Sequence, residues 1–465
     1  MPAHTPQDLV EHALRSSRSD QCVAVVTAGH SANLRWAGNT LTTNGVMHRV
    51  GVTVVAFHHR PDGVATASVS GAATTPEQVE QLTAAADGAA ARAQVAPDAA
   101  PLVEGAAAAD WDEPPGETSI AVYADLARGL GDAFRRADAS GRVLYGFVDH
   151  DVTTTYLGST TGLRLRHTQP TGHWGCTGKT ADLSASAWVG GATRDFADVE
   201  AARIDAELER RLAWSARTVE LPAGRYDTVL PPAAVADLMI YAYWSASARQ
   251  AHDGQSVFGR PGGGTRIGDQ LSRRPVTLFS DPTPEGYPSI AAAPFTVVGS
   301  SGDAASVFDN GYPLRRTDWV RDGVLEALVQ TRETAGMTGQ PLTPYVDNLV
   351  VEVDGASGSV YDLVAGTEHG LLVTCLYYIR EVDPQTLLLT GLTRDGVYLV
   401  EGGEVTAAVN NFRFNESPVE LLDRFTEASA TVPSFSREWG DEWPRTATPA
   451  LRVPDFNMST VSQAL

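Results

Sequence analysis

Hydrophobic and polar positions in the first half of the chain switch repeatedly between helical and strand spacing. Apolar side chains recur every three to four positions, as in an amphipathic helix, over residues 5–17, 75–93, 119–137 and 199–215. Strand-like runs occupy residues 21–27, 31–43, 46–57, 64–70 and 143–188. Asn44-Gly45 and residues 60–63 are the expected hairpin turns. The pattern predicts an N-terminal α/β domain with an antiparallel sheet and helices over residues 1–218, and the Pro- and Ala-rich stretch 95–118 marks a sub-boundary within it.

The second half of the chain has mainly strand patterns after a domain boundary at residues 220–224. These strand patterns cover residues 226–230, 275–280, 371–381, 387–395, 396–401 and 404–414. Helices are expected at residues 232–252, near Glu333, and at residues 361–368 and 418–428, whereas the segment from residue 432 onward looks irregular. We therefore expect a C-terminal, mostly antiparallel β domain over residues 219–465 and an α+β fold for the whole chain.

Composition and charge exclude several classes of partner. The 465 residues are 43% hydrophobic and 20% charged, which suits a globular protein of more than one domain. A formal net charge of −21 disfavours binding to nucleic-acid phosphates and to anionic membranes. The chain has no apolar stretch of membrane-spanning length, and residues 1–10 lack the features of a secretion signal. We expect a cytoplasmic protein with no nucleic-acid or membrane partner.

Metal-binding and nucleophilic motifs are missing from the sequence. None of the eleven histidines forms an HxxxH or HExxH pair, and the neighbours His58 and His59 point to opposite faces of a strand. Residues 175–180 end in Gly-Lys-Thr without the glycine spacing of a phosphate loop, so we expect a loop in a β region there. The three cysteines are widely separated, which fits a reducing compartment, and Cys375 is interpreted as a small buried side chain whose role stays open.

One strand near the C-terminus carries side chains suited to binding a peptide. Asn410, Asn411 and Arg413 offer amides and a guanidinium that can hydrogen-bond an extended backbone, and they are the candidate peptide-groove residues. A strand with one solvated face would have the same composition, so this alternative stays open.

Several motifs, taken in order, resemble the TldD/PmbA metallopeptidase family. The resemblance starts at residues 35–45 (RWAGNTLTTNG), continues at residues 256–258 (SVF) and includes residues 318–327 (DWVRDGVLEA). Further similar segments are residues 267–269, 276–283, 370–374, 396–404 and 411–414. The resemblance covers nearly the whole chain, and the order and spacing of the motifs carry it more than any one motif does.

The resemblance also places the family's zinc motif on this sequence. Members of the TldD branch carry HExxxH on the helix that opens the C-terminal domain, where two histidines hold zinc and the glutamate acts as base. Aligning the SVF motif without a gap puts Met239 and Trp244 at the histidine positions, Ile240 at the glutamate position and Ser247 at a further acidic position. Residues 233–251 contain no histidine, so no shift of register restores the motif. The resemblance therefore implies the TldE-like branch, with no metal ligand or catalytic residue in this chain.

The leading hypothesis is a TldE-like, non-catalytic subunit of a heterodimeric TldD/TldE zinc metallopeptidase that trims or degrades unfolded peptides. Under this hypothesis the chain binds no cofactor, zinc belongs to a TldD-like catalytic partner, and the substrate is an extended peptide. Two alternatives stay open: a stand-alone peptidase or hydrolase with an unrecognised site, and a homodimeric peptide-binding scaffold in peptide maturation. The sequence does not separate a heterodimer from a homodimer, because both kinds of interface use the same residue types.

Overall fold

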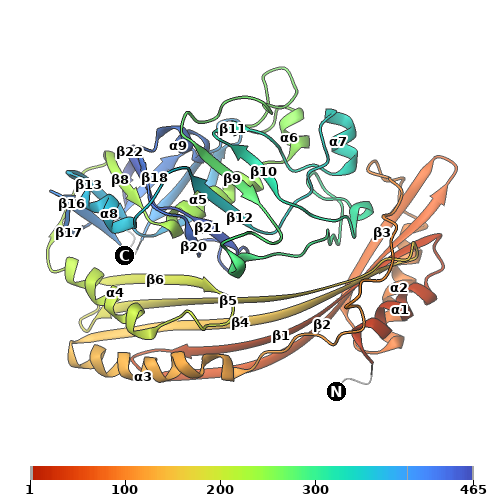
Figure 1. The fold of residues 1–465 in the computed structure, drawn as a ribbon, viewed down its shortest axis with the longest axis horizontal. Coiled ribbons are helices and arrows are strands. Elements are labelled where there is room, and N and C mark those ends of the chain that lie inside the picture. Colours follow the sequence, from red (N-terminus) through yellow and green to blue (C-terminus); the bar gives the residue numbers. More distant parts are fainter. Residues whose placement is uncertain (1–3, 395, 463–465) are drawn as a thin grey trace.

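The N-terminal region is a long curved sheet with helices on one face and the C-terminal domain on the other (Figure 1). The computed structural model describes residues 4–394 and 396–462. The strands of this sheet are β1 (Gln21–Trp36), β2 (Leu41–Arg60), β3 (Gly63–Ala72), β4 (Arg142–Ser159), β5 (Arg164–Thr180) and β6 (Ser186–Thr193). They lie in the order β3-β2-β1-β4-β5-β6, and every neighbouring pair is antiparallel. The predicted antiparallel N-terminal sheet is confirmed.

Four helices cover the outer face of this sheet. The strands place apolar side chains alternately on its two faces, so both faces must be covered. The helices are α1 (Pro6–Ser16), α2 (Pro76–Ala90), α3 (Ala124–Ala139), preceded by the 3-10 turn η1 (Ile120–Tyr123), and α4 (Ala201–Trp214). Helices α1 and α2 pack on β1 to β3, and α3 and α4 pack on β4 to β6. Ala24 and Leu34 of β1 contact the helices, whereas Val25, one position along, contacts the C-terminal domain. Thr75 caps α2 as predicted, with its side chain accepting a hydrogen bond from the backbone of Gln78.

The first hairpin turn lies six residues earlier than the sequence suggested. Gly38 and Asn39 both have positive φ, 62° and 58°, and form the turn between β1 and β2. Two consecutive residues with positive φ form a type I′ turn, whose backbone twist matches the right-handed twist of the two strands. The expected turn residues Asn44 and Gly45 instead lie inside β2, where Gly45 pairs with Asn33.

The C-terminal domain contains two further sheets. The six-stranded sheet runs β11 (Val324–Leu325), β10 (Thr317–Arg321), β9 (Val276–Ser280), β12 (Leu349–Val353), β21 (Thr446–Thr448), β20 (Val432–Ser434). The larger sheet runs β14 (Leu376–Asp383), β15 (Leu388–Thr393), β18 (Phe412–Glu416), β22 (Leu451–Val461), β8 (Gly224–Leu230), β13 (His369–Val373), β16 (Val397–Glu401), β17 (Glu404–Val409), β7 (Thr218–Val219), with β19 (Glu427–Ala428) paired to β22. Most neighbours are antiparallel, so the α+β prediction is confirmed; the parallel pairs are β12 with β21, β8 with β13, and β7 with β17.

Helix α5 (Pro232–Trp244) is the centre of this domain's core. Apart from Asp237, its side chains are apolar or aromatic all around, and it packs among side chains from both C-terminal sheets, as a largely buried helix must. The remaining helices are α6 (Ala248–His252), α7 (Arg332–Thr338), α8 (Val360–Ala365) and α9 (Pro418–Arg424), with 3-10 turns η2 (Pro288–Ile290) and η3 (Val307–Asp309). None of the described helices is long and apolar enough to cross a membrane.

Three further local predictions for individual elements were wrong. The helix expected over residues 232–252 breaks after Trp244, because Ser247 begins a new helix by accepting a hydrogen bond from Gln250. Residues 175–180 continue β5 and do not form a loop. The segment from residue 432 onward contains β20, β21 and β22; its pattern is hidden by a bulge at Asp455, where φ is 56°.

Candidate functional site between the two domains

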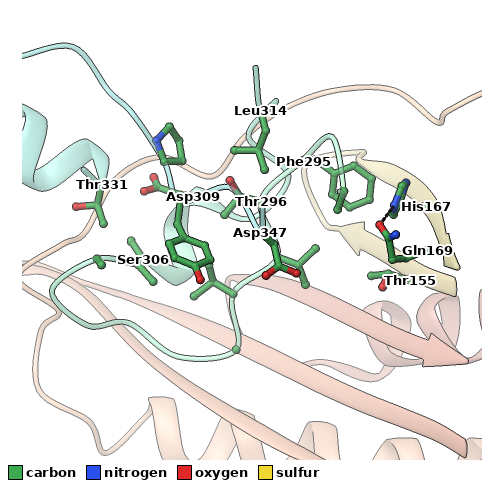
Figure 2. Close-up of a pocket in the computed structure, with 18 of the residues that line it drawn as sticks. Thr155, His167, Gln169, Phe295, Thr296, Ser306, Asp309, Leu314, Thr331 and Asp347 are labelled. Atoms are coloured by element: carbon green, nitrogen blue, oxygen red, sulfur yellow. Dashed lines mark hydrogen bonds between the residues drawn. The ribbon is translucent and has the colours of Figure 1, made fainter. Parts of the chain in front are cut away.

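A cavity of about 760 Å³ lies between the inner face of the N-terminal sheet and loops of the C-terminal domain (Figure 2). The wall from the sheet is polar and is formed by Thr153, Thr155, His167, Gln169 and Thr171. The facing wall mixes polar residues with an apolar part that includes Phe295, Val297, Val298, Leu314 and Tyr345. A volume of this size is typical of a small-ligand site, and a mixture of an apolar wall with polar groups gives a ligand both contact area and orientation.

The polar wall follows from the two-residue repeat of neighbouring strands. Thr155 of β4 lies opposite His167 of β5, and Thr153 lies opposite Gln169, so all four side chains share one face. His167 Nε2 and Gln169 Oε1 are 3.1 Å apart. Burial holds the pKa of His167 below its usual range, and the nearby Arg445 guanidinium lowers it further. The wall therefore offers hydrogen bonds from neutral groups at pH 7.

The acidic side chains that reach the cavity are paired with arginines. Asp347 forms an ion pair with Arg445, whose Nη1 also lies 3.2 Å from Thr171 Oγ1 of the opposite wall. Asp309 forms an ion pair with Arg332 at 2.5 Å. Burial raises the pKa of Asp347, and Arg445 opposes that shift. The cavity thus suits a ligand with hydrogen-bonding groups and apolar parts more than a strongly charged one.

One hydroxyl on the C-terminal wall is buried without a hydrogen-bond partner. Thr296 lines the cavity and is 9% exposed, and its Oγ1 has no hydrogen-bond partner among the described residues. A buried hydroxyl without a partner costs free energy.

A smaller side pocket of about 390 Å³ adjoins the cavity. Ala304 and Tyr345 line both spaces, so the two are neighbours. The other lining residues of the side pocket are Tyr243, Trp244, Ser247, Val329 and Glu442. The side pocket therefore lies at the end of α5, where the resemblance placed part of the zinc motif.

The residues at the expected zinc positions do not fit a metal ion. Met239 and Ile240 have no exposed surface and belong to the apolar core, while Trp244 is partly buried and lines the side pocket. Zinc in proteins takes histidine nitrogen, cysteine sulfur or carboxylate oxygen, and none of these three side chains supplies such a ligand. Across residues 4–394 and 396–462, no three His, Cys, Asp or Glu side chains gather in a way that could hold a metal.

The structure places the candidate peptide-groove residues away from the cavity and not on one strand as expected: Asn410 and Asn411 lie in the connection between β17 and β18, and Arg413 lies on β18. Asn410 Oδ1 accepts a hydrogen bond from the Leu221 backbone at 2.7 Å, and Asn411 Oδ1 accepts one from Thr393 Oγ1 at 3.1 Å. Arg413 is exposed on β18. None of the three lines the interdomain cavity. Their role in peptide binding stays a prediction.

The cysteines are all buried. Cys375 lies between β13 and β14, is 1% exposed, and its Sγ is 3.6 Å from the carbonyl oxygen of Leu376. Burial raises the pKa of the thiols of Cys22 and Cys176 to about 12. The interpretation of Cys375 as a small buried side chain agrees with its position.

Sequence reasoning missed the cavity itself. Its polar wall was visible as polar residues at every second position of one strand, from His167 to Thr171, but the covering loops, from Ala293 onward, are more than a hundred residues away on the other side of a domain boundary. Arg445 was missed because it lies in the segment that looked irregular.

Comparison with known proteins places the chain in a family. The model of the PmbA/TldA metallopeptidase C-terminal domain matches residues 223–460. The chain belongs to this family. A search of curated protein sequences found no significant match.

Solved structures share the fold of this family member over its whole length. TldE from Thermococcus kodakarensis is 15% identical with a TM-score of 0.71, covering 97% of this chain and 99% of that one. A putative modulator of a DNA gyrase from Thermotoga maritima is 16% identical with a TM-score of 0.70, covering 94% and 95%. A putative modulator of DNA gyrase from Bacteroides thetaiotaomicron is 13% identical with a TM-score of 0.70, covering 98% of both chains. At these identities the likeness shows that the fold is shared.

Proposed function

We propose that this family member is a TldE-like, non-catalytic subunit that binds peptide in the interdomain cavity and works with a TldD-like partner carrying the HExxxH zinc motif. The observation that carries this proposal is α5, whose expected zinc positions hold Met239, Ile240 and Trp244. A chain with these residues depends on another subunit for a metal-activated water.

The cavity supports peptide as the ligand. An extended backbone needs hydrogen-bond donors and acceptors along its length, and the wall from β4 and β5 offers neutral polar side chains in a row. The apolar wall would take side chains, with little selectivity for charge. Such a site suits unfolded peptides of varied sequence.

Aromatic side chains around α5 support a stabilising role for the helix. Trp244 lies between Trp439 and Trp443, with ring centroids 5.1 and 6.0 Å away. Tyr243 packs against Tyr345 and Trp443 at 5.2 and 5.3 Å. These contacts bury apolar area where a catalytic helix would need polar ligands.

The proposal is tested by co-expressing this chain with the HExxxH paralogue of the same genome. We expect a stable complex on affinity purification, zinc only when the paralogue's motif is intact, and cleavage of an unfolded peptide only when both chains are present.

Three results would each overturn the proposal. Full peptide cleavage by the paralogue alone would remove the need for this subunit. Stoichiometric zinc or peptide cleavage with this chain alone would favour the stand-alone enzyme. Peptide binding by a homodimer that ignores the paralogue would favour the scaffold.

A further inference from the structure

The side pocket at the end of α5 combines three aromatic rings with one carboxylate. The rings are those of Tyr243, Trp244 and Tyr345, the carboxylate is that of Glu442, and the lining residues include no Lys, Arg or His. Aromatic faces and a carboxylate together attract an organic cation, by the ring quadrupole and by charge. The composition of the pocket therefore matches an ammonium group better than an anion or an aliphatic side chain.

The rings are held firmly, so the pocket is largely pre-formed. The Tyr243 hydroxyl donates to the carbonyl oxygen of Val346 and accepts from its N–H, both at 3.0 Å. Tyr345 stacks on Tyr243 with an interplanar angle of 14°. Trp244 packs against Trp439 and Trp443, with ring centroids 5.1 and 6.0 Å away. Fixed rings lose little side-chain entropy when a ligand binds.

The carboxylate of Glu442 is not neutralised by a basic side chain near the pocket. Its carboxylate has no ion-pair partner among the described residues. The nearest arginines along these elements are engaged elsewhere, because Arg249 pairs with Glu333 and Arg445 pairs with Asp347. The net charge of −21 adds a general attraction for cations.

We propose that this side pocket binds the alkylammonium group of a peptide whose backbone lies in the adjoining cavity. This inference rests on the proposed function in one respect, because it takes a peptide to be the ligand that carries the ammonium group. The ammonium can come from a lysine side chain or from the peptide's N-terminus, and both present the same chemistry to the rings and to Glu442. The end of α5, where the resemblance placed part of the zinc motif, then helps to select the substrate.

The test measures binding of three seven-residue peptides to the purified full chain alone, by calorimetry or tryptophan fluorescence. The first is N-acetylated with one central lysine, the second is N-acetylated with glutamine in its place, and the third has the glutamine and a free N-terminus. We expect the first or the third to bind about tenfold more tightly than the second, in keeping with a cation–π contact joined to a carboxylate. The arm that gains affinity identifies the source of the ammonium. Equal affinity of all three would overturn the proposal.

Variants locate the effect in the pocket. Glu442→Gln and Trp244→Leu should bring the ratio of affinities close to one, whereas Trp244→Phe, which keeps an aromatic face, should retain most of it. Glu404→Gln is the matched control, because Glu404 is an exposed carboxylate in the β16–β17 turn, outside the pocket. A preference for ammonium that survives both Glu442→Gln and Trp244→Leu would place the cation elsewhere and overturn the assignment.

This test separates the present inference from the proposed function. A complex that forms and cleaves peptide while this chain shows no ammonium preference would remove the pocket assignment alone. An ammonium preference in this chain without any complex would remove the subunit proposal alone.

Discussion

At the scale of single residues, Asp237 shows how a buried acid fixes a distant segment. It is the only acid in residues 233–251 and has no exposed surface. Its Oδ1 accepts hydrogen bonds from the Ser436 hydroxyl and from the Glu438 N–H, while Oδ2 has no hydrogen-bond partner in the described part of the chain. Burial raises the pKa of Asp237 to about 8. The carboxyl is therefore protonated in the folded protein at neutral pH.

This pKa makes the stability of the fold depend on pH. The unfolded chain releases the Asp237 proton near pH 4 and the folded chain near pH 8, so the contribution of the protonated group is full at low pH and is lost as pH rises to about 8. The loss reaches up to about 1.4 kcal/mol per pH unit. Asp237→Asn is neutral at every pH and keeps an acceptor for both hydrogen bonds.

We expect the thermal midpoint of the wild type to fall relative to that of Asp237→Asn between pH 5.5 and pH 8.5. Differential scanning fluorimetry of both proteins in matched buffers measures this. Parallel curves over that range would show that the folded-state pKa is not raised.

The residues of the site were only partly accessible to sequence reasoning. Met239, Ile240 and Trp244 were identified because a motif fixes their spacing along one helix. Glu442 and Tyr345 could not be identified, because their relevance comes from meeting Trp244 in space. A local pattern predicts neighbours on one element but not contacts between elements.

At the scale of elements, the spacing of apolar residues correctly predicted long, regular elements. The prediction failed where a turn or a bulge interrupts that spacing. Helices α1 to α4 matched the helical spacing within a few residues, and the Thr75 cap was correct. Strand β22 was missed because Pro454 and the bulge at Asp455 break its alternation, and the β1–β2 turn was misplaced because Gly38-Asn39 competes with Asn44-Gly45. In both cases tertiary pairing decided between local signals.

Strand β2 has an open edge over its first half. It pairs with β1 from Leu41 to Phe57, but β3 begins to pair only at Gly51. Leu41, Val46 and Met47 are 44, 44 and 49% exposed in the part that β3 does not reach. Backbone groups that point away from β1 therefore meet solvent there.

Hydrogen exchange should report this open edge. In an antiparallel pair about half of the amides of a strand point to one neighbour, so about half of those in residues 41–50 should exchange rapidly. Residues 52–57, which pair on both sides, should stay protected and serve as the internal control. Exchange measured by mass spectrometry on the isolated chain checks this; equal protection of both segments would mean that another chain covers the edge.

At the scale of the whole molecule, aromatic contacts are among those that hold the C-terminal domain against the N-terminal domain. Phe308 packs against Phe57 at 5.0 Å, Phe435 stacks on His173 at 5.3 Å, and Trp214 of α4 packs against Tyr398 at 4.9 Å. Ser306 and Asp309, which flank the segment around Phe308, line the cavity. The sequence predicted two domains but not how they pack, because no pattern within either domain encodes the other's surface.

Filling the cavity should weaken peptide binding without unfolding the protein. Thr155→Trp places a large ring in the space of about 760 Å³, and we expect at least about a tenfold loss of peptide affinity, since binding depends on contact area and on the polar wall. Thr53→Trp is the matched control, on the same face of the sheet but outside the cavity lining. Calorimetry with an unfolded peptide measures both, and equal affinities would place the peptide site elsewhere.

The position of β22 has a consequence for how the protein is made. In the large C-terminal sheet β22 lies between β18 and β8, so strands formed by residues 224–230 and 412–416 become neighbours only through residues 451–461. A ribosome finishes β8 long before β22 emerges, which leaves two apolar strand edges open on the nascent chain. Such edges invite wrong pairing, so we expect the C-terminal domain to complete its sheet late in synthesis and to depend on chaperones during that interval.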